Sequence, residues 1–249
     1  IFTGQQLATR DWENILTDIF LLLSEFKKIK PQKNTLENLP SFPTEFFNKI
    51  IVEKVWDRFE KFTSENNFSL EDSFILNGKN TAPVNELISN ALSYITPTSK
   101  ADICFMHGDF FLGNLFFDFT SNRTLMVDPR GLVQNDIISN FGDYRYDLAK
   151  LSHSILGAYD LLLTKEVKIV HHQNSFELEL EYFKSDHYQM IKAIFIEQCW
   201  HHYKLEFKQL VALSALMFFS MLPLHGENKS KQMRLFANAL RLSEELNKN

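Results

Sequence analysis

The sequence predicts an α+β fold that is mainly helical and carries a few short strands near its centre. Residues 1–100 and 143–249 show apolar side chains at the three- and four-residue spacing of amphipathic helices. Between them, residues 103–131 contain three short apolar runs bounded by Gly, Asp, Asn or Pro, which is typical of strands joined by tight loops. Of the 249 residues, 45% are hydrophobic and 23% are charged, which is ordinary for a globular protein and argues against disorder.

Three helices are predicted in the N-terminal part of the chain. The first ends near Pro31, the second runs from about 44 to 64, and the third begins at Pro83, because proline is tolerated in a first helical turn. Residues 65–81 are predicted to form a polar connection. The side chains expected to face the core are Ile15, Leu16, Ile19, Phe20, Leu22, Leu23 and Phe26 in the first helix, Phe47, Ile50, Ile51, Val55, Phe59 and Phe62 in the second, and Leu87, Ile88, Ala91, Leu92 and Ile95 in the third.

The short strands are expected at residues 103–106, 115–117 and 125–127. The last two should form a small hairpin, because Ser121 and Asn122 between them favour a turn. After Gly142 the helical pattern returns, interrupted by a second predicted hairpin within residues 166–183. From about residue 186 three further helices are predicted, separated near residues 207 and 225–226.

Composition excludes several classes of protein. The net charge of −5 argues against a nucleic-acid binder, which would normally be basic. The apolar run 211–224 is shorter than the roughly 20 residues of a membrane span, so we interpret it as a core helix. With no signal-peptide pattern and only Cys104 and Cys199, expected to be free buried thiols, a cytoplasmic location is predicted. The 24 Phe residues suggest that phenylalanine fills much of the core.

The residues with the clearest chemistry follow the first predicted strand. Residues 107–114 read H-G-D-F-F-L-G-N, and Asp128 follows fourteen residues after Asn114. A strand that ends at Met106 should place Asp109 on an exposed loop, Asn114 precedes the next strand, and the hairpin returns Asp128 to the same end. One carboxylate could accept a proton, while an amide oxygen and a second carboxylate could hold Mg²⁺, which prefers oxygen ligands. Such a set suits phosphoryl transfer.

At these residues the chain resembles the aminoglycoside phosphotransferase and choline kinase family, whose catalytic loop has the form H-G-D-x-x-x-x-N. That loop is related to the protein-kinase catalytic loop and its metal-binding aspartate. The resemblance implies that Asp109 is the catalytic base and that Asn114 and Asp128 are the Mg²⁺ ligands, with ATP as the phosphate donor. It further implies that His107 supports the base of the loop.

A second stretch carries the same resemblance. Residues 142–149 read G-D-Y-R-Y-D-L-A, similar to the family's D-L-A helix start, and Asp147 would there bond to the backbone of the catalytic loop. Fructosamine-kinase-like members pair a D-P dipeptide after the strand with a comparable segment. The family pattern does not explain Arg130, which follows Asp128 and Pro129. Arg130 could meet a phosphate or acidic substrate, or it could be a structural partner of Asp136 or Asp143.

The resemblance implies that residues 1–249 form a protein-kinase-like C-terminal lobe that binds substrate and metal. Gly4-Gln5-Gln6-Leu7, followed by a long amphipathic helix, resembles the segment after the family's interlobe hinge. The family's N-terminal β lobe, whose lysine pairs with the ATP phosphates, is then expected to be absent from this chain and to be a partner from the same protein.

The function expected from the resemblance is transfer of phosphate from ATP, with Mg²⁺, to a hydroxyl of a small molecule. Amino sugars, aminoglycosides, choline or ethanolamine, fructosamines and capsular sugars are all compatible acceptors, and GTP is an alternative donor. Two other functions stay open: a catalytically inactive kinase-like binding module, and the kinase part of a larger surface-polysaccharide biosynthesis protein. Neither a nucleic-acid partner nor a membrane span is expected, and the oligomeric state is not specified by the sequence.

Overall fold

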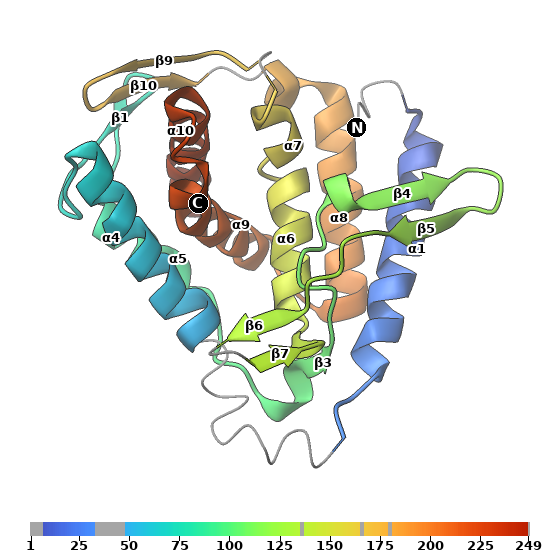
Figure 1. Ribbon diagram of the computed structural model, residues 1–249. Coiled ribbons are helices and arrows are strands. Elements are labelled where there is room, and N and C mark those ends of the chain that lie inside the picture. Colours follow the sequence, from blue (N-terminus) through green and yellow to red (C-terminus); the bar gives the residue numbers. More distant parts are fainter. Residues whose placement is uncertain (1–6, 33–47, 135–136, 165–166, 179–180, 249) are drawn as a thin grey trace. The chain divides into compact units, whose positions relative to one another are not determined.

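The computed structural model is α+β and mainly helical, with several small sheets, as the sequence predicts (Figure 1). It describes residues 7–32, 48–134, 137–164, 167–178 and 181–248. The predictions made for Gly4, Gln5, Gln6, Phe47 and Asp136 lie outside these residues. The chain forms two compact units: a first unit of residues 1–48, 97–151 and 182–206, and a second unit of residues 49–96, 152–181 and 207–249.

Two long helices support the first unit. Helix α1 (Thr9–Lys28) packs against helix α8 (Asp186–Tyr203) and against strands β3 (Ile103–Phe105) and β5 (Arg123–Met126). The carboxylate of Asp11 accepts the N–H of Ala8 at 3.0 Å, which caps the start of α1. The predicted inner face of α1 is confirmed, with Leu22 only half-buried; its buried side chains are Ile15, Leu16, Ile19, Phe20, Leu23 and Phe26, together with Trp12.

The strands of the first unit form three separate antiparallel pairs. Strand β3 (Ile103–Phe105) pairs with β8 (Phe141–Asp143), β4 (Leu115–Asp118) with β5 (Arg123–Met126), and β6 (Leu132–Gln134) with β7 (Ile137–Ser139). The three predicted strands and the predicted β4–β5 hairpin are therefore confirmed. Strands β6, β7 and β8 are not expected from the sequence, because each has at most two apolar residues in succession and does not stand out as an apolar run.

Helix α6 (Arg145–Ile155) follows β8 and brings its first turns to the first unit. The sequence predicts one continuous helical stretch beyond Gly142, whereas the structure has a break. Ala158 adopts a left-handed backbone with φ of 48°, which ends the helical run before the short helix α7 (Tyr159–Leu162). Short 3₁₀ helices elsewhere in the chain span Lys100–Asp102, Leu112–Asn114, Glu181–Lys184 and Leu222–His225.

The second unit is built around helix α9 (Phe207–Met221), which packs against helices α4 (Lys54–Asn66), α5 (Val84–Ser93) and α10 (Lys229–Leu246). The helix predicted over residues 44–64 differs from this arrangement. Asn48–Glu53 is π-helical, regular α-helix begins only at Lys54, and residues 44–47 lie outside the described part.

A four-stranded sheet completes the second unit, in the order β2-β1-β10-β9. Strands β9 (Ile169–His172) and β10 (Ser175–Leu178) form the predicted second hairpin. Strands β1 (Ile75–Leu76) and β2 (Lys79–Asn80) lie in the region predicted to be a polar connection, so that prediction is wrong. Because β1 is only two residues long and pairs in parallel with a strand about 100 residues away, no local pattern could reveal it.

Phenylalanine fills the interior of the second unit, as the composition suggests. The ring of Phe236 is fully buried, and the centroids of two neighbouring rings, those of Phe62 and Phe74, lie 5.0 Å from its own. We call this group the phenylalanine cluster, and its members are Phe59, Phe62, Phe68, Phe74, Phe176, Phe219 and Phe236.

The most apolar stretch of the chain lies in the same unit. Phe207–His225 is long and apolar enough to cross a membrane by length and composition, and among the described residues it is the only such stretch. Of its most apolar window, 72% is buried inside the protein, which agrees with its interpretation as a core helix. Cys104 and Cys199 are both free and buried, as predicted.

Candidate functional site

The predicted catalytic loop, residues 107–114, leaves β3 through a close contact between two glycines. Gly108 has a φ of +82°, and a Cβ on it would lie 2.0 Å from the carbonyl oxygen of Gly131. The carbonyl oxygen of His107 accepts the N–H groups of both Arg130 and Gly131 at 2.9 Å. We call these four residues the neck. Only glycine permits this approach and this φ at position 108, which explains the G of the H-G-D motif.

His107 connects the loop to the end of strand β5. Its ring is buried, Nε2 lies 3.0 Å from the carbonyl oxygen of Val127, and Nδ1 lies 3.3 Å from the backbone nitrogen of Asp109. Burial lowers the pKa of His107, which favours the neutral ring. A neutral ring with its proton on Nε2 satisfies both contacts, because Nε2 then donates to Val127 and Nδ1 accepts the Asp109 N–H.

Asp147 holds the loop from the other side. Its carboxylate is buried and accepts the backbone N–H of His107 at 2.7 Å and that of Gly108 at 2.9 Å. These are the backbone contacts that the sequence resemblance implies. Burial raises the pKa of Asp147 to about 6, although both N–H groups favour the ionised form.

Asp109 and Asn114 lie in direct contact. The Asn114 amide Nδ2 donates to the Asp109 backbone oxygen at 3.0 Å and lies 3.3 Å from its carboxylate Oδ2. The sequence predicts that Asp109 lies on an exposed loop, but only 6% of the residue is exposed. The difference arises because Lys150 of α6, Arg130 and Asn114 contact the carboxylate, whereas the sequence shows only the local pattern of the loop.

Asp128 and Arg130 extend the cluster toward solvent. Asp128 has a left-handed φ of 56°, and its carboxylate Oδ2 accepts Arg130 Nη2 at 3.0 Å. Arg130 Nε also lies 3.4 Å from Asp109 Oδ2, so the guanidinium joins the two carboxylates. The alternative pairing of Arg130 with Asp143 is not observed, since Asp143 binds Arg145 through a buried bidentate contact. Non-glycine residues in left-handed conformations are often found at functional sites.

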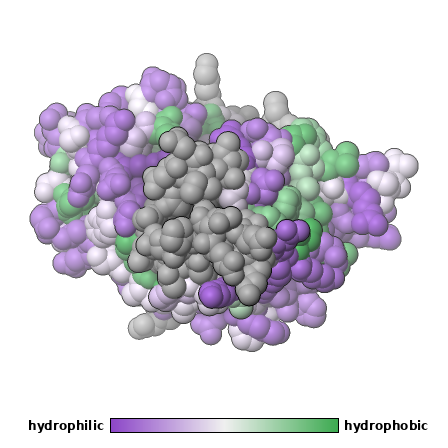
Figure 2. Space-filling view, turned by 60° about the horizontal axis from the view of Figure 1, so that its bottom comes forward, coloured by the Kyte–Doolittle hydropathy of each residue, from purple (hydrophilic) through white to green (hydrophobic). Residues whose placement is uncertain are grey.

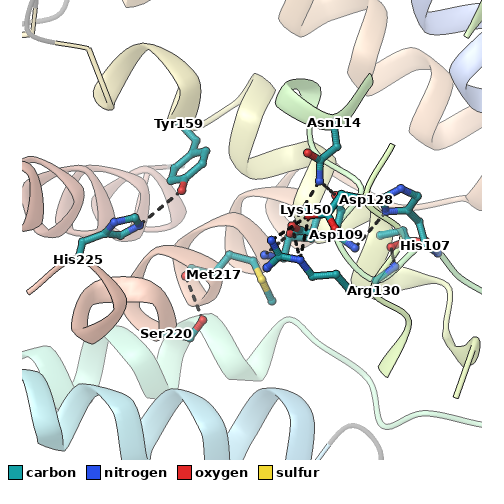
Figure 3. Close-up of polar contacts among 12 residues, drawn as sticks. His107, Asp109, Asn114, Asp128, Arg130, Lys150, Tyr159, Met217, Ser220 and His225 are labelled. Carbon is teal, nitrogen blue, oxygen red and sulfur yellow. Dashed lines mark hydrogen bonds and ion pairs between the residues drawn. The ribbon is translucent and has the colours of Figure 1, made fainter. Parts of the chain in front are cut away.

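Lys150 is a charged residue next to Asp109 that the sequence-based prediction of the site does not include. Its Nζ lies 3.0 Å from Asp109 Oδ1 (Figure 3). Lys150 follows Asp147 by three residues on α6, so both side chains leave the same face of the helix. This spacing was visible in the sequence, and it would have placed Lys150 next to any loop that Asp147 holds.

Asn114 and Asp128 carry the kinds of oxygen that Mg²⁺ prefers, one amide and one carboxylate. In this structure the Asn114 amide directs Nδ2 toward Asp109, and the Asp128 carboxylate is paired with Arg130. The backbone N–H of Val127 donates to the Asn114 carbonyl at 3.0 Å, which joins the residue before Asp128 to Asn114 at the end of the hairpin. Mg²⁺ takes one or two protein ligands of this type and keeps several waters. Within the described ranges, no three His, Cys, Asp or Glu side chains gather into a group that could hold a metal.

The hairpin next to these residues exposes an apolar face. Phe116 and Leu125 are paired across the two strands and are 53% and 61% exposed, and Val127 is also exposed on the same side as Leu125. Figure 2 shows hydrophobic surface on the right of the view, the side to which the β4–β5 hairpin extends in Figure 1. Exposed apolar surface beside polar residues is typical of a surface that meets a ligand or a partner.

Comparison with known proteins adds no relative. The chain matches no protein-family model, no curated protein and no solved structure. The resemblance to the aminoglycoside phosphotransferase and choline kinase family therefore stays a prediction that rests on the motif residues quoted above.

Proposed function

We propose that the protein is an ATP- and Mg²⁺-dependent phosphotransferase of the kinase-like fold that acts on a hydroxyl group of a small molecule. The observation that carries the proposal is the burial of the Asp109 carboxylate and the set of contacts that hold it. This carboxylate is almost fully buried, contacts Asn114, and belongs to a loop whose backbone is held by both Asp147 and His107. A general base must be positioned in this way, since geometry decides its efficiency before its pKa does.

In the proposed reaction, the acceptor hydroxyl binds with its proton directed at the Asp109 carboxylate. The hydroxyl oxygen attacks the γ-phosphorus of ATP and forms the new P–O bond. The bond between the γ-phosphorus and the bridging oxygen breaks, ADP leaves, and the hydroxyl proton passes to Asp109. Phosphoryl transfer asks the protein mainly to position groups and to neutralise charge.

Asn114 and Asp128 are the residues proposed to hold Mg²⁺, through the amide oxygen and the carboxylate. When bound, the metal would neutralise negative charge on the nucleotide phosphates. Arg130 now contacts the carboxylates of both Asp128 and Asp109, so it lies where a phosphate oxygen could become its partner instead.

The remaining features support the same proposal. The exposed apolar face of Phe116 and Leu125 lies directly after Asn114 and before Asp128, and it could contact the base of a nucleotide. The buried free thiols of Cys104 and Cys199 agree with the reducing cytoplasm, where ATP is available. We propose that the family's N-terminal β lobe completes the nucleotide site.

The proposal can be tested by screening hydroxyl-bearing metabolites for ATP consumption by the full-length protein. With an active acceptor, Asp109→Asn should lower kcat by about 10²–10⁴-fold, because it removes a positioned base. Asp118→Asn is the matched control, since Asp118 is an exposed carboxylate at the end of β4 that bonds only within its own turn among the contacts observed. Equal kcat values for Asp109→Asn and wild type would exclude the base role.

The proposed role of Asp128 as a Mg²⁺ ligand can be tested by the Mg²⁺ dependence of activity. Asp128→Ala should raise the Mg²⁺ concentration needed for half-maximal activity, whereas Asp118→Asn should leave it unchanged. An unaltered Mg²⁺ requirement in Asp128→Ala would show that the metal is held elsewhere.

A further inference from the structure

We propose that Lys150 is a positioning residue that fixes one oxygen of the Asp109 carboxylate so that the other oxygen faces the acceptor hydroxyl. This inference rests on the proposed phosphotransferase function and assigns different tasks to the two oxygens of Asp109. The resemblance that suggested Asp109, Asn114 and Asp128 did not include Lys150, and the assignment comes from its contacts alone.

Helix α6 holds three consecutive residues of the loop from two positions one turn apart. Asp147 accepts the N–H groups of His107 and Gly108, and Lys150 contacts the side chain of Asp109. The backbone of the loop and the carboxylate that it presents are therefore fixed by the same rigid element. A catalytic group is positioned best when its supporting contacts come from a helix or strand.

The two oxygens of Asp109 contact different cations, and Oδ2 also lies 3.3 Å from Asn114 Nδ2. Oδ1 lies 3.0 Å from Lys150 Nζ, and the side chain of Lys150 is only 20% exposed. Oδ2 lies 3.4 Å from Arg130 Nε, and the side chain of Arg130 is 63% exposed. An exposed side chain on a loop can leave its partner at small cost, whereas a mostly buried lysine on a helix is held in place.

The acceptor hydroxyl is therefore expected to replace Arg130 at Oδ2, while Lys150 stays on Oδ1. The proton of the hydroxyl passes to Oδ2 as the oxygen attacks the γ-phosphorus, and the guanidinium of Arg130 is free to follow the phosphate oxygens. Without Lys150, the contact of Oδ2 with Asn114 Nδ2 would be the remaining side-chain restraint observed on the Asp109 carboxylate once Arg130 leaves. Oδ2 would then be aimed at the hydroxyl only part of the time.

The test compares Lys150→Met, which keeps the chain length but removes the charge, with Lys150→Arg, which keeps the charge. Lys150→Met should lower kcat by about 10²-fold while the KM values for acceptor and ATP stay within a few-fold of wild type, since a misplaced group costs rate rather than binding. Lys150→Arg should recover most of the loss. In an Asp109→Asn background, Lys150→Met should cause no further loss, because its effect is exerted through Asp109.

Lys27→Met is the matched control. Lys27 is a partly buried lysine of the same unit, and it lies over the rings of Tyr144 and Tyr203. The Lys27→Met variant should therefore have the kcat of wild type. A purely structural role for Lys150 predicts instead that Lys150→Met lowers the residual rate of Asp109→Asn as well, and that result would overturn the inference. The inference also fails if wild type is active and Lys150→Met retains its kcat. A wild type that phosphorylates no acceptor would overturn the proposed function itself and leave Lys150 with nothing to position.

Discussion

The 107–114 loop of the first unit and the phenylalanine cluster of the second are both buried, but opposite kinds of interaction hold them. Around the loop, His107, Asp109 and Asp147 are buried polar side chains, and each has hydrogen-bonding or ionic partners. In the cluster, fully buried aromatic rings such as Phe236 contact one another through their faces and edges.

This difference separates stability from positioning. Burial of apolar surface is strongly favourable and non-directional, so the cluster can stabilise a fold without fixing any single atom. Burial of carboxylates costs free energy that their partners only partly return, but each hydrogen bond fixes a direction. Burial of Asp109 and Asp147 at one loop therefore lowers stability but fixes the orientation of the loop and of the Asp109 carboxylate. Such a loss of stability is expected at a site of chemistry.

The largest expected effect on stability is in the cluster. Phe236→Ala should lower the free energy of unfolding by about 3–5 kcal/mol, because it removes a fully buried ring and leaves a cavity among six others. Denaturant unfolding followed by circular dichroism measures this change. The control is Phe116→Ala, on the exposed face of the hairpin, which should change stability by less than about 0.5 kcal/mol. Similar losses for the two variants would show that the phenylalanine cluster contributes no more to stability than the exposed face of the hairpin.

The next effect is a pH dependence that comes from Asp147. Its pKa is about 6 in the folded protein and near 3.8 when exposed, so between these values the folded state binds a proton that the unfolded state lacks. The free energy of unfolding contributed by Asp147 therefore falls as the pH rises through this window. Asp147→Asn removes this titration. The free energy of unfolding of wild type minus that of the variant should therefore fall by up to about 3 kcal/mol from pH 4 to pH 7.

Urea unfolding at pH 4, 5, 6 and 7 measures that difference. Asp118→Asn provides a control for which the difference from wild type should stay nearly constant over this pH range, because hydrogen bonds from Ser121 and Thr120 lower the pKa of the exposed Asp118 carboxyl. Its stabilising contribution is present above pH 4 and is lost as the pH falls. A difference for Asp147→Asn that increases with rising pH would show that the two backbone N–H groups outweigh the burial.

A smaller effect on stability is expected at the neck. Gly108→Ala should destabilise the protein by about 1–3 kcal/mol through its left-handed φ, and the clash with Gly131 should move the loop and lower kcat by about 10²-fold. Gly78→Ala is the matched control, because Gly78 has a similar φ of +76° and nothing within 4 Å of the added Cβ. Gly78→Ala should therefore show the backbone cost without a loss of activity. Equal kcat values for the two variants would mean that the neck does not position the loop.

The parts of the fold that the sequence predicts are those with a strong local pattern. The face of α1 and the β4–β5 hairpin follow from residue spacing and turn residues, because their partners lie close in the chain or share one apolar face. Strand β1 escapes prediction, since its two residues are held by pairing with β10 and by the Asn77 side chain, which bonds to both the N–H and the carbonyl of Leu178.

The candidate site shows the same division. Asp109, Asn114 and Asp128 could be selected from their residue types and spacing, and the structure brings Asp109 into contact with Asn114 and joins it to Asp128 through Arg130. The burial of Asp109 and the contact of Lys150 could not be deduced from the loop alone. Both depend on how α6 packs beside the loop, which is a tertiary feature without a signature in residues 107–114.

The neck also allows the length of the β4–β5 hairpin to change without moving the residues of the candidate site. The backbone carbonyl of His107 accepts hydrogen bonds from Arg130 and Gly131. The segment from Gly108 to Gly131 is therefore a loop of the chain whose two ends are held together. Extra residues at its far tip, beside Asn122, add only the slowly growing entropy of a longer loop, about 0.6 kcal/mol for each doubling. An epitope or a fluorescent label inserted at that tip should therefore leave the positions of the neck residues unchanged.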